Sequence, residues 1–318
     1  NRNWLVLGSG AGALTTEKSF AAGVPAIGWR STTLRLLVLT VHSSFDDGII
    51  VLQAPPRRLC YTVAMHRETA SALQQSIAHV FIGVADMAPV RELWVQHFGL
   101  ETVAERSGAD AELSRLWALP ADAIAAQLLL RTPGVSAGWL HFVQFTAPDL
   151  PVRATARPTD LCPKNIDVNC VGMSTRYTEL AAAGFQFRSA ISDYEIGELR
   201  ASEVQMPAHD EVNVVLIEVQ DWPLALSHRH YGAVTSFVST VPDTAAEADF
   251  YRTLLGLDEL LHHRITGPAI EQVVGLPPGA ALDMRLLGDA HQCYGRVELI
   301  AYEGIAGRNL YPRARPPA

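Results

Sequence analysis

Lysine is almost absent from this 318-residue sequence, in which Lys18 and Lys164 are the only two. Acidic residues outnumber basic ones by 33 to 25, so the formal net charge is −8 and the pI is about 5.8. Nucleic-acid backbones are bound by clustered lysine and arginine. The densest positive stretch, Arg308–Arg315, is a proline-rich tail that we expect to be solvated. The charge pattern therefore argues against nucleic acid as a partner.

Cysteine is also scarce. The sequence has Cys60, Cys162, Cys170 and Cys293, which show no zinc-like spacing and are too few for a disulfide framework in a chain of this length. Cys170 alternates with Val168 as a strand residue does, so we expect buried free thiols. This cysteine usage favours a reducing, cytoplasmic location.

Long hydrophobic runs are missing as well. No apolar run reaches the roughly 18 residues that a membrane span needs, and the stretch Leu34–Val41 is predicted to be a core strand. The apolar start from Trp4 to Ala13 is short and broken by glycines, unlike a signal peptide. We therefore expect no membrane partner.

Several catalytic motifs are absent, among them the nucleophile elbow Gly-x-Ser-x-Gly and the phosphate-binding Gly-x-x-x-x-Gly-Lys. The glycine-rich turn Gly8–Ala13 follows an apolar strand and resembles a dinucleotide-binding turn. However, Gly28–Arg30 stands where such a site needs an acidic residue for the ribose. We predict that the chain binds neither NAD nor FAD.

An internal repeat is the most informative feature that is present. Residues 79–147 align without a gap on residues 236–304 at an offset of 157 (236 − 79). Landmarks of different kinds keep this offset: Asp86 and Asp243, Leu119-Pro120 and Leu276-Pro277, Gly138 and Gly295. Such agreement over nearly seventy residues predicts two copies of one structural unit.

Each copy has the same predicted order of elements. A short apolar strand ends at an aspartate that can cap a helix, the helix ends at Gly-Leu, and three strand-like runs follow. The last run is 139–145 in one copy and 296–302 in the other. The expected order is therefore β-α-β-β-β.

The pattern of strand, Val-x-Asp, helix ending in Gly-Leu and a terminal Val-Glu-Leu-Ile-x-Tyr resembles the vicinal oxygen chelate superfamily. That superfamily includes glyoxalases, extradiol dioxygenases and bleomycin-binding proteins. Weaker copies of the pattern occupy 1–70 and 165–219, and we number the modules 1 (1–70), 2 (79–147), 3 (165–219) and 4 (233–304).

The resemblance implies an α+β fold in which four βαβββ modules pair into two cupped, barrel-like mixed sheets. The composition, 48% hydrophobic and 18% charged, is that of a globular chain, and the length suggests about two domains of roughly 150 residues. We expect these domains to span 1–150, with modules 1 and 2, and 151–318, with modules 3 and 4.

The resemblance also locates a candidate site on the first and last strands of a module. These positions are His79 and His141 in module 2, and Ser236 and Glu298 in module 4, 62 residues apart in each case (141 − 79 and 298 − 236). Two imidazoles and a carboxylate form a common set of metal ligands. We therefore predict that His79, His141 and Glu298 hold a divalent metal: Fe(II), Mn, Zn, Ni or Co.

Three further residues are expected to line the substrate pocket: Ser236, Phe145 and Tyr302. In module 3, Ile166 and Val215 stand at the positions of the metal ligands, with Asp167 displaced from them in strand phase. The histidines are equally compatible with packing or hydrogen-bonding roles.

The resemblance implies a metal-dependent enzyme that acts on a small organic substrate with vicinal oxygens. Its chemistry would be that of a lyase or isomerase, or that of a ring-cleaving dioxygenase. The alternative is a protein of the same fold that binds small molecules without catalysis. A small-molecule substrate is thus the expected partner, and a homodimer is one assembly that the sequence leaves open.

Overall fold

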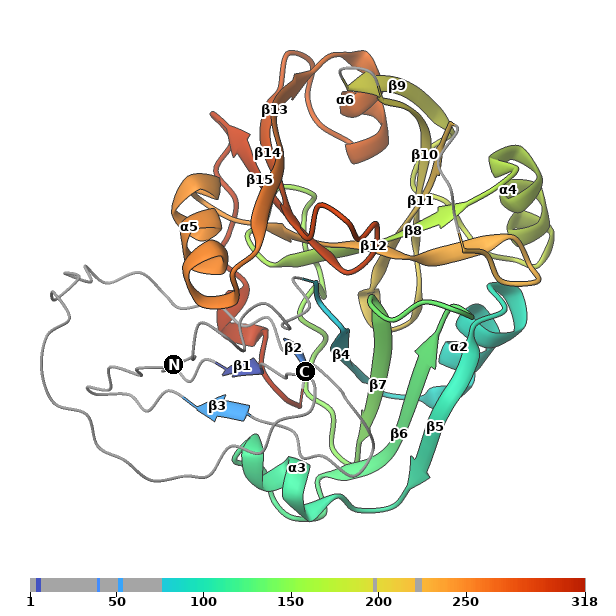
Figure 1. The fold of residues 1–318 in the computed structure, drawn as a ribbon, viewed down its shortest axis with the longest axis vertical. Coiled ribbons are helices and arrows are strands. Elements are labelled where there is room, and N and C mark those ends of the chain that lie inside the picture. Colours follow the sequence, from blue (N-terminus) through green and yellow to red (C-terminus); the bar gives the residue numbers. More distant parts are fainter. Residues whose placement is uncertain are drawn as a thin grey trace, which may run out of the picture.

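The computed structural model describes residues 4–6, 39–40, 51–53, 76–196, 199–220 and 225–317. Within these residues the chain forms an eight-stranded mixed sheet, a five-stranded mixed sheet and a separate pair of short strands. In Figure 1 the eight-stranded sheet curls through the upper half of the molecule and the five-stranded sheet lies below it.

Modules 3 and 4 together build the eight-stranded sheet, in the order β13-β14-β15-β12-β8-β11-β10-β9. Module 3 consists of β8 (Pro163–Cys170), α4 (Met173–Ala182), β9 (Ser192–Ile196), β10 (Leu199–Pro207), the short helix η2 (His209–Glu211) and β11 (Asn213–Val219). Module 4 consists of β12 (Tyr231–Thr240), α5 (Thr244–Leu255), β13 (Asp258–Thr266), α6 (Pro268–Val274), β14 (Ala281–Gly288) and β15 (Arg296–Glu303), and η3 (Tyr311–Arg313) follows it. The first strands β8 and β12 pair antiparallel at the centre, which joins the two modules.

Module 2 forms most of the five-stranded sheet, whose order is β2-β4-β7-β6-β5. Its elements are β4 (His79–Val84), α2 (Met87–Val90) with its π-helical continuation η1 (Arg91–His97), β5 (Glu101–Ser107), α3 (Ala111–Leu116), β6 (Ile124–Arg131) and β7 (Trp139–Phe145). The edge strand β2 (Leu39–Thr40) pairs with β4, while β1 (Trp4–Val6) and β3 (Val51–Gln53) pair with each other.

The expected helix caps are present at equivalent places in modules 2 and 4. Asp86 accepts a hydrogen bond from the amide of Ala88 at 2.9 Å, and Asp243 accepts from the amides of Ala245 and Ala246 at 3.0 Å each. These carboxylates satisfy amide groups that a helix leaves free in its first turn, and thus fix where each helix begins.

The internal repeat is reproduced in the register of the strands. His79 pairs with Trp139 on the parallel strands of module 2, and Ser236 pairs with Arg296 on those of module 4. Likewise, His141 lies opposite Leu129, and Glu298 lies opposite Leu286. Each pair is shifted by 157, so His79 corresponds to Ser236 and His141 to Glu298 in the fold as well as in the sequence.

Modules 2 and 4 meet at two equivalent glycines, Gly138 and Gly295, whose φ angles are +72° and +67°. A Cβ atom on Gly138 would lie 2.5 Å from the carbonyl oxygen of Val234, and one on Gly295 would lie 2.2 Å from that of Ile77. Ile77 and Val234 are themselves equivalent in the repeat (77 + 157 = 234). The contact therefore has the form of a local twofold axis, and only glycine fits on either side of it.

The expectation of two cupped sheets, each built from a pair of modules, is met only in part. The curled sheet of modules 3 and 4 is one such cup, whereas module 2 contributes a smaller sheet, and most of module 1 lies outside the described residues. In module 1, β1 coincides with the apolar strand expected before Gly8, and β2 falls within the expected strand Leu34–Val41. No helix in the described part of the chain is long and apolar enough to span a membrane.

Candidate active site in the eight-stranded sheet

The inner face of the curled sheet is unusually polar for a buried surface. On the central strand β8, Ile166 and Val168 pack into the main hydrophobic core, whereas Asp167 and Asn169 on the opposite face line a cavity inside the curl. Both of these polar residues are about 3% exposed. Because burial of polar side chains costs free energy, their presence at the centre of the sheet points to a function.

Asp167, Ser236 and Glu298 form a hydrogen-bonded cluster in this cavity. The hydroxyl of Ser236 donates to Oδ2 of Asp167 at 2.7 Å and lies 3.5 Å from Oε2 of Glu298. The amide of Asn165 donates to Oδ1 of Asp167 at 2.9 Å. The strand register brings the three together, since Ser236 pairs with Asp167 on β8, and Glu298 stands on β15, next to β12.

The carboxyl groups of this cluster have raised pKa values. Burial raises the pKa of Asp167 to about 7, against the stabilising hydrogen bonds of Asn165 and Ser236. Burial, together with the charges of Asp167 and Glu203, raises the pKa of Glu298 well above its ordinary value. Buried carboxyl groups this close cannot all ionise. At neutral pH at least one of them therefore carries a proton that it can donate.

Lys164 brings a cation to the same cavity. A register shift between β8 and β12 occurs beside it, where Val238 pairs with Asn165 but Ser239 pairs with Pro163. Lys164 is 5% exposed, donates a hydrogen bond to the phenol oxygen of Tyr302 and lies 4.9 Å from the centre of that ring. Burial lowers the pKa of its ammonium group to about 8, with a further contribution from the charge of Arg153.

Glu203 on β10 is the third acidic group of the cavity. Its carboxylate accepts hydrogen bonds from the phenol of Tyr194 at 2.8 Å and from the amide of Gln205 at 3.2 Å. Gln205 is held in turn by Asn213, whose amide donates to it at 3.1 Å. Burial raises the pKa of Glu203. This network fixes one side of the cavity, because every rotation of Glu203 breaks a hydrogen bond.

The remainder of the cavity wall is apolar, and the volume enclosed is about 150 Å³. The wall comes from β13, α6, β14 and β15: Leu261, Ile265, Ile270, Val274, Leu282, Met284, Leu286 and Ile300. Figure 1 shows α6 at the open end of the curl, between β13 and β9. The cavity thus combines a polar floor with an apolar wall, which is typical of small-molecule sites.

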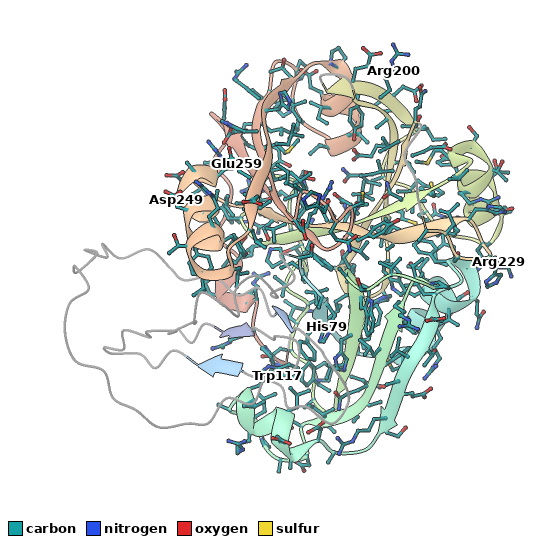
Figure 2. The ribbon with its side chains drawn as sticks, viewed as in Figure 1. His79, Trp117, Arg200, Arg229, Asp249 and Glu259 are labelled. Carbon is teal, nitrogen blue, oxygen red and sulfur yellow. The ribbon has the colours of Figure 1, made fainter. Side chains whose placement is uncertain are left out.

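The sequence-predicted site residues fall into two groups. Ser236, Glu298 and Tyr302 line this cavity together. His79 and His141 lie instead on the five-stranded sheet, with ring centres 5.5 Å apart (His79 is labelled in Figure 2). Nε2 of His141 lies 3.1 Å from the side-chain oxygen of Gln127. The structure therefore brings the two histidines together but not with Glu298.

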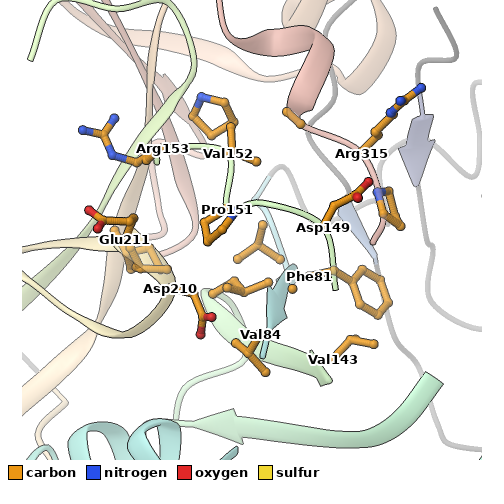
Figure 3. A pocket seen from close by; sticks show the side chains of 18 of the residues that line it. Phe81, Val84, Val143, Asp149, Pro151, Val152, Arg153, Asp210, Glu211 and Arg315 are labelled. Carbon is orange, nitrogen blue, oxygen red and sulfur yellow. The ribbon is translucent and has the colours of Figure 1, made fainter. Parts of the chain in front are cut away.

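Phe145 lies in a second cavity of about 230 Å³, away from Ser236 and Tyr302. This cavity lies between the two sheets, and Figure 3 shows Phe81, Val143 and Asp210 among the residues around it. Phe145 also packs against Trp117, with ring centres 6.0 Å apart. The predicted pocket wall is thus divided between two separate cavities.

One placement expected from the sequence is wrong. The sequence pattern places Ile166 at the ligand position of module 3 and Asp167 in the opposite phase. In the structure Asp167 faces the cavity and pairs with Ser236, while Ile166 packs in the core. The reason is that β8 and β12 are joined through register shifts, which sequence spacing does not show. Lys164 and Glu203 were missed altogether. Their strands, Pro-Lys-Asn-Ile-Asp-Val-Asn-Cys and Leu-Arg-Ala-Ser-Glu-Val-Gln-Met-Pro, carry several other polar residues, so no local pattern singled them out.

A divalent metal is the cofactor that the resemblance implies. In the cavity, the positions that correspond to metal ligands hold Asp167, Ser236, Ile217 and Glu298, a set without an imidazole. Throughout the described ranges, no three His, Cys, Asp or Glu side chains converge closely enough to hold a metal ion. These residues do not fit the predicted site of two histidines and a carboxylate. Metal binding by His79 and His141 stays a prediction.

The likenesses to known proteins are distant. No family model matches the chain, and no curated protein matches it. Among solved structures, glyoxalase I from Zea mays is 14% identical, with a TM-score of 0.49 over 72% of this chain and 68% of that one. A putative dioxygenase from Bacillus subtilis is 11% identical, with a TM-score of 0.45 over 71% and 64%.

A mutant of 4-hydroxymandelate synthase from Streptomyces coelicolor is 14% identical, with a TM-score of 0.33 over 76% of this chain and 97% of that one. At these identities such likenesses concern the fold alone. The order β-α-β-β-β is the one expected from the resemblance to the vicinal oxygen chelate superfamily.

Proposed function

We propose that the cavity of the eight-stranded sheet is the active site of an enzyme that transfers protons on a small organic substrate with vicinal oxygens. The substrate class would be that of an α-hydroxy ketone or α-hydroxy aldehyde. The observation that carries the proposal is the pair of carboxyl groups, the buried Asp167 and the partly buried Glu298, bridged by the hydroxyl of Ser236.

The bridge assigns different roles to the two carboxyl groups. The single hydrogen of Ser236 goes to Asp167 at 2.7 Å, so the 3.5 Å contact with Glu298 is satisfied when Glu298 is protonated and donates. Asp167 is then the base, and Glu298 is the acid. Two titratable groups whose environments separate their protonation states are the usual arrangement for acid–base catalysis.

In the proposed reaction Asp167 removes the proton from the carbon that bears the substrate hydroxyl. Glu298 donates its proton to the neighbouring carbonyl oxygen, so the electron pair of the broken C–H bond forms a C=C bond and an enediol results. Return of the protons to exchanged positions gives the isomer, or the starting compound with a hydrogen from solvent. A positioned acid or base contributes roughly 10²- to 10⁴-fold to such a step.

The rest of the cavity supports this chemistry. The apolar wall from β13, β14 and α6 would hold the carbon skeleton and exclude water. Exclusion of water strengthens the hydrogen bonds to the substrate oxygens and protects a reactive enediol. The volume of about 150 Å³ limits the substrate to a few carbon atoms beyond the reacting pair.

Binding without catalysis is the second candidate function. It is favoured by the hydrogen bonds that already join the carboxyl groups to Ser236, Asn165, Tyr194 and Gln205. A cavity with this polarity could retain a small amphiphilic molecule without altering it.

Solvent exchange separates the two candidates. Protein in D₂O is incubated with hydroxyacetone, glycolaldehyde and 3-hydroxybutan-2-one, and loss of the C–H signal beside the hydroxyl is followed by proton NMR. The enzyme proposal predicts exchange above the buffer rate, reduced at least 100-fold in Asp167→Asn and Glu298→Gln. Glu195→Gln is the matched control, because Glu195 is 69% exposed on β9. Binding of these compounds without exchange would support the second candidate and refute the first.

A further inference from the structure

Lys164 stands out among the groups that the proposed proton transfer leaves unused. It is the only lysine in the described part of the chain and one of two in the whole sequence. Lysine is rarely buried, because its ammonium group loses the favourable hydration of water. Here it is 5% exposed and lines the cavity together with Asp167 and Glu298.

The contacts of Lys164 hold its amine at the cavity rather than at the surface. Its Nζ donates to the phenol oxygen of Tyr302 and lies over the ring of the same residue. Tyr302 is four residues beyond Glu298 on β15, so phenol and carboxyl group share the inner face of one strand. An amine, a phenol and a carboxyl group therefore face one enclosed space.

We propose that Lys164 is a nucleophilic amine that forms an imine with aldehydes and ketones bound in this cavity. The site would take small carbonyl compounds with an apolar body that fits against Ile270, Val274 and Met284. This inference deepens the proposed function. It rests on that function because both place their chemistry in the same cavity.

The addition can be written with its protons balanced. The neutral amine of Lys164 attacks the carbonyl carbon, a C–N bond forms, and the C=O electron pair moves to oxygen, which takes a proton from Glu298. The amine proton then passes to the Glu298 carboxylate, which delivers it in the next step. A second proton transfer to that oxygen releases it as water and leaves a protonated imine. Water reverses the sequence and restores the free amine.

The surroundings of Lys164 favour its reactive form. Burial lowers the pKa of the ammonium group to about 8, so about a tenth of the amine is neutral at pH 7, against less than a thousandth for a lysine of ordinary pKa near 10.4. A buried amine beside an apolar wall is a known route to such activation. A protonated imine withdraws electrons from the adjacent carbon. It therefore acidifies the same C–H bond from which Asp167 is proposed to remove a proton.

The low lysine content makes the test direct. Protein is incubated with glycolaldehyde and sodium cyanoborohydride at pH 7, and adducts are located by intact mass and peptide mapping. We expect one adduct at Lys164, formed at least tenfold faster than adducts at Lys18 or the N-terminal amine. It should be absent in Lys164→Met and retained in Lys18→Arg. Labelling of Lys164 no faster than the other amines would overturn the proposal.

A second measurement uses the unaltered protein, so its result does not depend on whether a variant folds. The rate of labelling at Lys164 should rise with a midpoint near pH 8, and a midpoint near 10.4, the ordinary lysine value, would overturn the proposal. Deuterium exchange separates this inference from the proposed function. Asp167→Asn should lose exchange but keep the adduct, whereas Lys164→Met should lose both. Exchange at the full rate in Lys164→Met would refute the imine and leave the acid–base proposal standing.

Discussion

Replacement of Asp167 by asparagine should stabilise the protein above neutral pH, although the change is made at the centre of the candidate site. The amide has nearly the same shape as the carboxyl group and can still accept the 2.7 Å hydrogen bond from Ser236. Its NH₂ group would face Asn165, whose side-chain oxygen is buried without a partner in the described structure and would become the acceptor. The change thus removes a buried ionisable group with little loss of packing.

The magnitude follows from the pKa of Asp167. Folding raises this pKa from about 3.9 in an unfolded chain to about 7, so the folded state binds the proton more tightly. The folded protein is therefore relatively favoured below pH 4, and this advantage is lost as the pH rises towards 7. A shift of about three pKa units corresponds to a cost of about 4 kcal/mol above pH 7. Asparagine does not ionise, so the variant does not lose this stability.

The assay is urea unfolding of wild type and Asp167→Asn at pH 4.5 and pH 8.0, followed by tryptophan fluorescence and circular dichroism. We expect the variant to be more stable by up to about 4 kcal/mol at pH 8.0, and the difference to fall below about 1 kcal/mol at pH 4.5. Asp249→Asn is the control, because Asp249 is 78% exposed on α5. A destabilised variant at pH 8.0, or an equal difference at both pH values, would refute the assigned protonation.

Gly295→Ala should cost at least about 2 kcal/mol of stability, because a left-handed residue with a Cβ atom costs roughly 1–2 kcal/mol and its Cβ would also meet the carbonyl of Ile77 at 2.2 Å. Gly304 has a similar φ of +69° but open space around it, so Gly304→Ala should lose only the stability that the left-handed backbone costs. If urea unfolding shows the same loss of stability in both variants, the clash with Ile77 is contradicted. If His79 and His141 bind a metal, elemental analysis should find it in wild type and not in His141→Ala, and binding should weaken as the pH falls through about 6.5. A wild type without stoichiometric metal, and with no thermal stabilisation by Fe(II), Mn(II), Zn(II), Ni(II) or Co(II), would exclude that site. Met284→Ala should weaken substrate binding in the exchange assay, whereas Phe145→Ala should lower the melting temperature and leave exchange unchanged; the reverse pattern would assign the active site to the cavity between the sheets.

The sequence predicted what depends on local pattern and on the repeat. The offset of 157 gave the correspondence of His79 with Ser236 and of His141 with Glu298, because equivalent strands keep equivalent registers. The capping role of Asp86 and Asp243 followed from the residues beside them. These features require no knowledge of which modules come together.

What could not be predicted depends on the pairing between modules. Modules 3 and 4 share a sheet, and this places Glu298 beside Asp167 rather than beside the histidines of module 2. Any module with a first strand of this kind could pair with any other, so the ligand set could not be chosen from spacing. The orientation of Lys164 depends on the shift in register between β8 and β12, which results from packing across the whole strand pair.

The contact between Gly138 and Gly295 bears on how the internal repeat arose. Equivalent residues that touch across a local twofold axis are the mark of an isologous interface, in which two identical subunits present the same patch to each other. A duplication that joined two such subunits in one chain would turn that interface into an internal contact. The two halves could then diverge, with an acidic pocket in one and a histidine pair in the other. Neither glycine can carry a side chain in this arrangement, because a Cβ atom on either one would meet the backbone of the other module.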